Sequence, residues 1–432
     1  MDLSLLTTIV WFTVAQLLQD YNGWSRSAPQ PLTEREDRLK RLSESLCRLL
    51  LVADAFFDDL KLHPGNCPCG GRFQSKGRRP RVLVTTVGEV TYSRRYYECS
   101  QCGTHRIPVD DAWGVESGCL SPRAKSEASD LATALPYREA HYWLERLGGI
   151  GVSLSTLWRV TQRAGAALVT AERARLKESE SRSGAAKFLE AMRHPGTAVR
   201  PVMGVDGLFL RVQREWREVK IAVVGQLSER GEWVKGQTSY LATLEPAERF
   251  RQMLVRHALD RGITRWSPVV IVSDGAEWIA TLARRFYPKA RHIVDYWHAK
   301  QYLWKAAYRL FGEGSAEAAA WVEEMKSHLW KGEIKAIADR VEADRRQRQI
   351  NSAEAVEELR KAVQYLQERV ESLRYEEFQK RGDPTGSGPA EGGCKAVVQS
   401  RMKRSGMNWS PEGAENMLAL RARYCARIHA LS

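Results

Sequence analysis

The spacing of hydrophobic residues predicts a helical N-terminal region over residues 1–62. Hydrophobic positions recur there every three or four residues, and the polar segment Ser25–Pro31 divides the region into two helices. Leu3–Gln19 carries no charge, but it is short for a bilayer span and lacks the preceding basic residues of a signal peptide. We therefore expect a packed or oligomer-forming helix in a cytoplasmic protein that does not enter the membrane.

A region of short strands follows at residues 63–120. Arg81–Val90 and Val90–Tyr97 are rich in valine, threonine and tyrosine, and Gly88-Glu89 has the composition of a turn between them. This pattern predicts a β-hairpin.

Helical spacing returns over residues 121–198. Tyr137–Leu147 and Ser153–Ala164, separated by a glycine-rich turn, have the lengths of a helix-turn-helix. Ser153 is a candidate N-cap of the second helix, and Arg159 lies on the face expected to be exposed. The pair is either a DNA-reading element or a plain packing element.

From residue 199 to 432 the pattern becomes that of an α/β domain. The predicted strands are Val202–Val212, Val219–Leu227, Ser239–Leu244, Val269–Val272 and His292–Val294. Helices are predicted at Glu245–Arg261 and Glu277–Phe286. Residues 296–381 have helical periodicity and almost no strand signal, and a glycine-rich segment then introduces a last helical stretch.

The charge of the chain favours an anionic partner. Hydrophobic residues make up 43% and charged residues 27%, as in ordinary globular proteins, but the net charge is +14. Two stretches, 70–108 and 395–432, supply most of it. Their basic residues are Arg72, Lys76, Arg78, Arg79, Arg81, Arg94, Arg95 and Arg106, and Lys395, Arg401, Lys403, Arg404, Arg421, Arg423 and Arg427. Each stretch is either solvated surface or a set of DNA phosphate contacts.

Four of the eight cysteines form two tight pairs, as in a metal site of a reducing compartment. Cys67 and Cys69, then Cys99 and Cys102, resemble the two knuckles of a zinc ribbon, which holds a structural Zn²⁺ through four thiolates. The first pair is one residue tighter than usual. Either that knuckle is compressed, or His63 replaces Cys67. We expect the hairpin between the knuckles to contact DNA through Arg78, Arg79, Arg94 and Arg95.

Two aspartates occupy costly positions for a carboxylate. Asp206 interrupts an apolar strand, and Asp274 follows the apolar run Val269–Ser273. Open α/β sheets place their sites at such carboxyl ends, and paired aspartates there hold Mg²⁺ or Mn²⁺ through oxygen ligands. For each aspartate alone, a helix cap or a turn residue is the competing interpretation.

Several segments together resemble the ISKra family of bacterial insertion-sequence transposases. The matching segments are Cys99–Gly103, Tyr137–Ala140, Gly204–Gly207, Trp216–Lys220, Val272–Ala276, Asp295–His298, Tyr302–Trp304, Gly386–Glu391 and Arg401–Trp409. The resemblance implies an RNase H-like core in which Glu391 is the third metal-binding acid beside Asp206 and Asp274. A helical insertion at about 314–382 would then explain why Glu391 lies so far along the chain.

The residues around Glu391 support this placement. Lys395 lies four positions further on the same helical face, where it would meet a phosphate beside the metals. Arg401, Lys403 and Arg404 are further candidate DNA contacts. The competing acids Glu377, Asp383 and Glu412 stand in solvent-facing helix or turn contexts.

The expected activity is therefore metal-dependent cleavage of double-stranded DNA at insertion-sequence ends, followed by 3′-OH strand transfer into target DNA. Two ions about 4 Å apart activate a water and stabilise the leaving oxygen in such reactions. His298 is expected to orient a phosphate or to cap a helix, and Asp295 to be structural. A homodimer or higher oligomer on nucleoid DNA is implied. A non-catalytic DNA-binding regulator and a nuclease that does not join are the alternatives.

Overall fold

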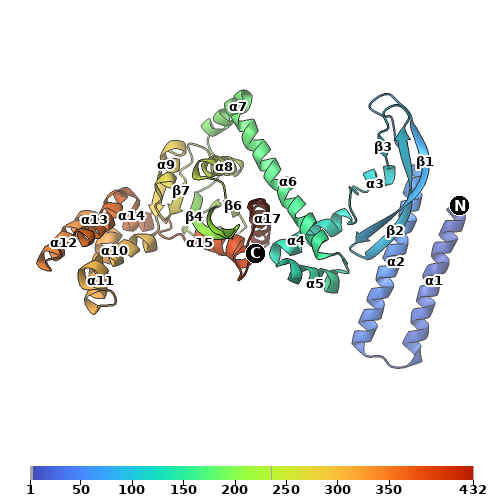
Figure 1. Ribbon diagram of the computed structural model, residues 1–432, viewed down its shortest axis with the longest axis horizontal. Helices are drawn as coiled ribbons and strands as arrows, with labels where there is room; N and C mark the ends of the chain where they lie inside the picture. The colour runs from blue at the N-terminus through green and yellow to red at the C-terminus, as the bar shows by residue number, and fades with distance from the viewer. Residues whose placement is uncertain (1–2, 235, 432) are drawn as a thin grey trace. The chain divides into compact units, whose positions relative to one another are not determined.

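The protein is a mixed α/β protein formed by two compact units, Met1–Thr161 and Gln162–Ser432. A computed structural model describes residues 3–234 and 236–431 (Figure 1). The boundary falls inside the long helix α6 (Leu154–Glu180). The region predicted at 121–198 is therefore divided, because Leu176 of α6 and Met192 of α7 (Arg182–Arg193) pack into the core of the second unit.

The first unit begins with two long helices that lie side by side (Figure 1), α1 (Leu3–Ser27) and α2 (Leu32–Lys61). The predicted helical region and its proline-containing break are confirmed. In the described part of the chain, no helix combines the length and the hydropathy that crossing a membrane requires.

A three-stranded antiparallel sheet follows, with β1 (Phe73–Thr85), β2 (Gly88–Cys99) and β3 (His105–Arg106). The predicted hairpin is confirmed, but its predicted turn is wrong by two residues. Thr85 pairs with Gly88 and its hydroxyl donates to the Gly88 carbonyl at 2.7 Å, so Thr86 and Val87 form the turn. The Thr85 side chain therefore closes the hairpin across the turn.

The rest of the first unit is helical. The short α3 (Pro108–Ala112) is followed by α4 (Pro122–Ala134) and α5 (Tyr137–Gly148), and the first turns of α6 pack with them. Ala124, Ala128 and Ala132 lie on the buried face of α4. Their small side chains let the neighbouring helices approach closely.

The second unit contains a five-stranded sheet in the order β6-β5-β4-β7-β8. The strands are β4 (Pro201–Val212), β5 (Glu215–Gln226), β6 (Ser239–Thr243), β7 (Val270–Ser273) and β8 (Arg291–Val294). β5 is antiparallel to both β4 and β6, whereas β7 and β8 run parallel to β4. All five predicted strands are present. β5 starts four residues earlier than expected, because its first residues, from Glu215 onward, pair with the end of β4.

Both faces of this sheet are covered. α8 (Ala247–Asp260) and α9 (Glu277–Phe286) pack on the face that presents Met203 and Val205. The opposite face presents Val202, and it shares one core with a set of helices that follows β8. Successive residues of β4 therefore point to opposite cores, as strand geometry requires.

The helical set after β8 comprises α10 (Tyr296–Phe311), α11 (Ala316–Lys331), α12 (Ile334–Gln347), α13 (Ala353–Gln367) and α14 (Tyr375–Lys380). It lies at one end of the unit in Figure 1. An insertion was expected over 314–382, but the helical set already begins with α10 and has no core separate from the sheet.

The chain then returns to the sheet through α15 (Gly388–Gly393), a π-helical turn at Cys394–Gln399, α16 (Ser400–Met402) and α17 (Pro411–His429). α15 packs against β4 and β5, and α17 packs against the edge strand β6. The last helical segment predicted from the sequence is thus broken into four pieces.

Candidate functional site

The two predicted aspartates are neighbours across the sheet. Val205 pairs with Ser273 in the parallel register of β4 and β7, so the next residues, Asp206 and Asp274, lie side by side. Both side chains are partly buried. Burial raises the pKa of Asp206, and the nearby charge of Asp274 raises it further. Two carboxylates held together in this way favour a cation between them.

Hydrogen bonds fix the orientation of Asp206. Its Oδ1 accepts from the backbone amide of Gly207 at 2.7 Å, and its Oδ2 accepts from the Cys394 thiol at 3.4 Å. Burial, followed by the charges of Asp206 and Glu391, raises the pKa of Cys394 above its ordinary range. Cys394 therefore remains a neutral donor to Asp206. This role was not predicted from the sequence, because nothing in the local pattern of a lone cysteine indicates it.

Asp274 sits in a turn that the helical set holds in place. The Asp274 carbonyl accepts from the Tyr365 hydroxyl at 2.6 Å, and the Gly275 carbonyl accepts from Arg369 Nε at 2.9 Å. Gly275 has a φ of +84°, and a Cβ there would lie 2.6 Å from the Tyr365 hydroxyl. Only glycine fits this conformation and this space.

Glu391 reaches the same region because α15 packs closely on the sheet. A Cβ on Gly204 of β4 would lie 2.9 Å from the Cβ of Ala390, and one on Gly393 would lie 2.5 Å from Val223 of β5. Because these two glycines lack a Cβ, the backbone of α15 can approach the sheet closely, and Glu391 therefore lies beside the strand of Asp206. The Glu391 side chain is exposed.

Asp295 connects β8, α10 and the glycine-rich segment before Glu391. Its Oδ1 accepts from the His298 backbone amide at 2.9 Å and lies 3.2 Å from His298 Nδ1, while its Oδ2 accepts from the Ser387 amide. Burial acts to raise the pKa of Asp295, but the hydrogen bonds from His298 and Ser387 outweigh it and lower the pKa to about 2. Asp295 thus has the structural role expected for it.

The His298 imidazole lies close enough to Asp206 and Asp274 to be affected by their charges. Its hydrogen bond to Asp295 raises the pKa of His298, burial opposes this, and the charges of Asp274 and Asp206 add to the increase. A raised pKa favours the protonated imidazole, which is the form that binds an anionic phosphate.

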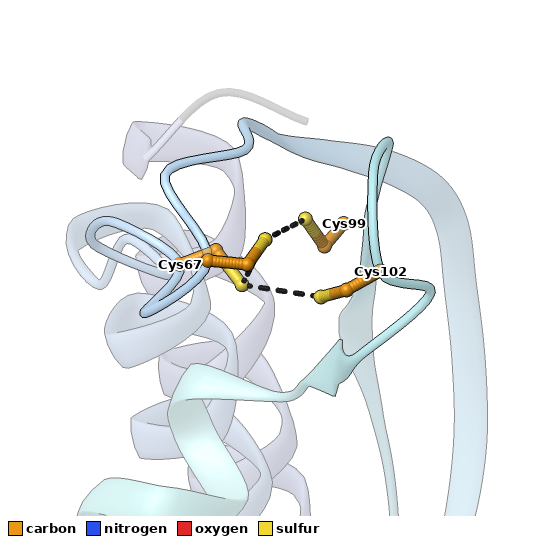
Figure 2. Close-up of side chains that lie close together, drawn as sticks. Cys67, Cys99 and Cys102 are labelled. Atoms are coloured by element: carbon orange, nitrogen blue, oxygen red, sulfur yellow. Dashed lines mark hydrogen bonds between the residues drawn. The ribbon is translucent and has the colours of Figure 1, made fainter.

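The four predicted zinc ligands lie together in the first unit. The sulfurs of Cys67, Cys69, Cys99 and Cys102 all lie within 4.8 Å of one another (Figure 2). Three of their Sγ–Sγ distances are 3.4, 3.5 and 3.5 Å. Four thiolates around Zn²⁺ would be separated by about 3.8 Å, given Zn–S bonds of about 2.3 Å in a tetrahedron. The cluster therefore fits a tetrahedral metal ion after a small expansion.

The cluster contains Cys67, and His63 is exposed outside it. The alternative in which His63 replaces Cys67 is therefore not what the geometry favours. The Thr104 hydroxyl and the Thr104 amide lower the pKa of Cys102 to about 6, and the amides of Cys102 and Gln101 lower the pKa of Cys99. These donors therefore favour the thiolate at Cys99 and Cys102, whereas the pKa values of Cys67 and Cys69 are raised.

Within the described residues, the cysteines are the one group of three or more candidate ligands that converge to 4.8 Å. Asp206 and Asp274 follow paired positions of β4 and β7, and Glu391 lies on the helix packed against β4, but the three acids do not all lie within that distance of one another.

The two helices predicted for the helix-turn-helix are present as α5 and the start of α6. α5 ends at Gly148, and the Ser153 hydroxyl accepts from the Thr156 amide at 3.2 Å, which confirms Ser153 as the cap of α6. Arg159 is exposed on the second helix. α6 runs on to Glu180, well beyond the predicted end.

The basic hairpin provides fewer available arginines than expected. Arg94 is 9% exposed and bonds to Asp110, so its predicted role as a phosphate contact is wrong. Arg78 and Arg95 pair with the buried Asp59. Arg79 remains exposed and lies over the Tyr96 ring at 3.7 Å.

A similar division holds near the C-terminus. Arg401 is 1% exposed, with its guanidinium 5.5 Å from the centre of the Trp409 ring, so it cannot serve as the predicted surface contact. Lys395, Lys403 and Arg404 are exposed. Three of the four predicted contacts in this stretch therefore remain on the surface.

Comparison with known proteins places the chain in a family. Residues 30–430 match the model of an uncharacterised protein family, UPF0236. The protein described as "UPF0236 protein in vanSb 3'region" from Streptococcus gallolyticus is 22% identical over 353 residues, which cover 79% of this chain and 71% of that protein. Because the family match covers nearly the whole chain, the protein belongs to the uncharacterised family UPF0236.

Proposed function

We propose that this protein is a DDE-type DNA transposase whose metal-binding acids are Asp206, Asp274 and Glu391. The observation that carries the proposal is the placement of Asp206 and Asp274 on adjacent parallel strands, with Glu391 on a helix packed against the strand of Asp206. Such an arrangement holds divalent cations at a DNA phosphate.

The topology supports an RNase H-like core. Three antiparallel strands, β4 to β6, are continued by β7 and β8 in parallel on the other side of β4. RNase H-like enzymes place two acids on the central strand and on its parallel neighbour, as Asp206 and Asp274 are placed here. The resemblance to ISKra transposases is independent support, because it rests on sequence segments and not on the strand order.

The residues of the chain have separate tasks in this proposal. Mg²⁺ or Mn²⁺ held by the three acids would activate a water and stabilise the leaving 3′ oxygen. Cys394 and the Gly207 amide orient Asp206, and the Tyr365 hydroxyl orients the Asp274 turn. His298 and the exposed Lys395 bind the phosphate. The same site then aligns the new 3′-OH with target DNA.

The first unit would bind the ends of the element. A zinc ribbon at the four cysteines, the exposed Arg79 and the second helix of the helix-turn-helix with Arg159 present groups for double-stranded DNA. Because two ends have to be joined, the active form is expected to be a homodimer or a higher oligomer.

The test uses purified protein, Mg²⁺ or Mn²⁺, DNA carrying the element's ends, and a target plasmid. We expect cleavage at the ends followed by strand-transfer products. Asp206→Asn, Asp274→Asn or Glu391→Gln should each lower cleavage by about a thousandfold or more. Glu412→Gln, at an exposed glutamate of α17, is the matched control and should be fully active.

The outcomes separate the alternatives. Cleavage without joining would favour a nuclease, and DNA binding without cleavage would favour a regulator. Full activity in any one of the three acid variants would refute the proposed triad.

A further inference from the structure

A groove between α10 and α13 opens next to the candidate active site. It has a volume of about 850 Å³. Aromatic rings and cations alternate along it, from Tyr302, Lys305 and Arg309 of α10 to Lys361, Tyr365 and Arg369 of α13 and the turn after it. This volume is within the range of sites that take a ligand of nucleotide size or larger.

Four of these side chains form a continuous stack. The Tyr302 and Tyr365 rings are parallel within 6°, with centroids 3.6 Å apart. Lys305 Nζ lies 4.1 Å from the centre of the Tyr302 ring, and the Arg369 guanidinium carbon lies 4.1 Å from that of Tyr365. The cations thus lie on the two outer faces of the tyrosine pair, which fixes their positions along the groove.

The stack ends at the turn that carries the candidate catalytic acid. The Tyr365 hydroxyl donates to the Asp274 carbonyl, and Arg369 Nε donates to the Gly275 carbonyl. A chain bound along the groove would therefore lead directly to the phosphate at Asp274.

The charges that line the groove are nearly balanced, because Glu313, Glu358 and Glu368 lie beside Lys305, Arg309, Lys361 and Arg369. Arg309 is paired with Glu358 at 2.7 Å, and Lys361 lies 3.6 Å from Glu357. Lys305, in contrast, has no carboxylate within 4.0 Å among the residues that the structure describes. Tyr308 also lines the groove and is 39% exposed, so its ring is open to stacking.

We propose that this groove binds an unpaired DNA strand flanking the phosphate that is cut. Phosphates bind Lys305 and Lys361, and a base stacks on Tyr308, which is how proteins hold single strands without reading their sequence. The direction of the groove toward Asp274 rests on the proposed function, but the binding itself does not.

The test measures the affinity of a fluorescein-labelled oligothymidylate of about ten nucleotides by anisotropy, and that of a duplex of equal length, over a series of salt concentrations. The background is Asp206→Asn, so no cleavage interferes. The double variant Lys305→Gln with Lys361→Gln should weaken single-strand binding. The slope of the logarithm of the binding constant against the logarithm of the salt concentration should become shallower by about 0.7 for each lysine. Duplex binding should be unchanged. Lys335→Gln, at an exposed lysine of α12 outside the groove, is the matched control.

A second variant tests the stacking independently of charge. Tyr308→Ala should weaken single-strand binding about tenfold, and Tyr308→Phe should retain it, because the ring and not the hydroxyl carries the contact.

Three results would overturn the inference: lysine variants that bind the single strand as tightly as the control, equal losses for single strand and duplex, or displacement of the oligonucleotide by oligoglutamate at comparable concentration. Failure of the proposed function has a different signature. In that case the wild type does not cleave the ends with metal, while single-strand binding in the groove is intact.

Discussion

Replacing Asp295 with asparagine removes the charge that joins three segments of the second unit. The carboxylate accepts from the backbone and the ring of His298 and from the amide of Ser387, and the side chain of Asp295 is 1% exposed. Asparagine offers one acceptor and one donor in the same space. Its amide group would face an N–H donor on one side, so at least one buried hydrogen bond is lost.

The magnitude follows from the pKa of Asp295. Although burial opposes ionisation, hydrogen bonds from His298 and Ser387 lower the pKa from 3.8 to about 2. A depression of this size corresponds to about 2 kcal/mol of folding free energy. Because the folded pKa is the lower one, this stabilisation is present above pH 4 and disappears as the pH falls through 2.

The assay is urea unfolding followed by tryptophan fluorescence, at pH values from 7 down to 3. We expect Asp295→Asn to lower the unfolding free energy by about 2 kcal/mol at pH 7, and the difference from wild type to shrink toward the acid end. Asp339→Asn, at an exposed aspartate of α12, is the control and should match the wild type. A difference below about 0.5 kcal/mol at pH 7, or one that does not change with pH, would refute this reasoning.

Three further predictions concern the cysteine cluster, the Asp274 turn and the basic hairpin. Cys102→Ser should abolish zinc binding, and His63→Ala should retain one ion per chain by mass spectrometry; equal zinc contents would contradict the four-thiolate site. Gly275→Ala should cost about 2 kcal/mol, from the positive φ and a displaced tyrosine hydroxyl, in urea unfolding; an unchanged midpoint would argue against the turn. Arg94→Ala should destabilise the first unit by about 2–3 kcal/mol in thermal melts, because the buried Asp110 carboxylate loses one of its two arginine partners and keeps only Arg81. Arg79→Ala should leave the melting temperature unchanged and make the slope of log binding constant against log salt concentration shallower by about 1. The opposite pattern would make Arg94 the DNA contact and Arg79 the structural residue.

The strands of the second unit could be predicted because burial on both faces leaves a continuous apolar run. The neighbourhood of Asp206 and Asp274 also follows from the sequence once their strands are taken as adjacent and parallel. Glu391 is different. Its position depends on Gly204 and Gly393, which are close-approach sites that no local pattern of α15 reveals.

The burial of Arg94 could have been predicted in part from the sequence. Val90, Tyr92 and Arg94 alternate along β2, and all three point to the buried face. Strand alternation alone would have placed the arginine inward. Its partner Asp110, however, comes from a short helix beyond β3, and pairing over that distance depends on the fold.

The geometry of the site depends on segments that are remote from one another in sequence. Asp295 fixes the entry to α15 through Ser387, Cys394 returns from α15 to Asp206, and Tyr365 holds the Asp274 turn from the helical set. Each acid is thus positioned by a different part of the unit, and none of these supports is itself a metal ligand. Because the helical set shares a core with the sheet, its groove and the Asp274 turn form one packed structure. A strand of DNA bound in that groove would therefore stabilise the turn that carries Asp274.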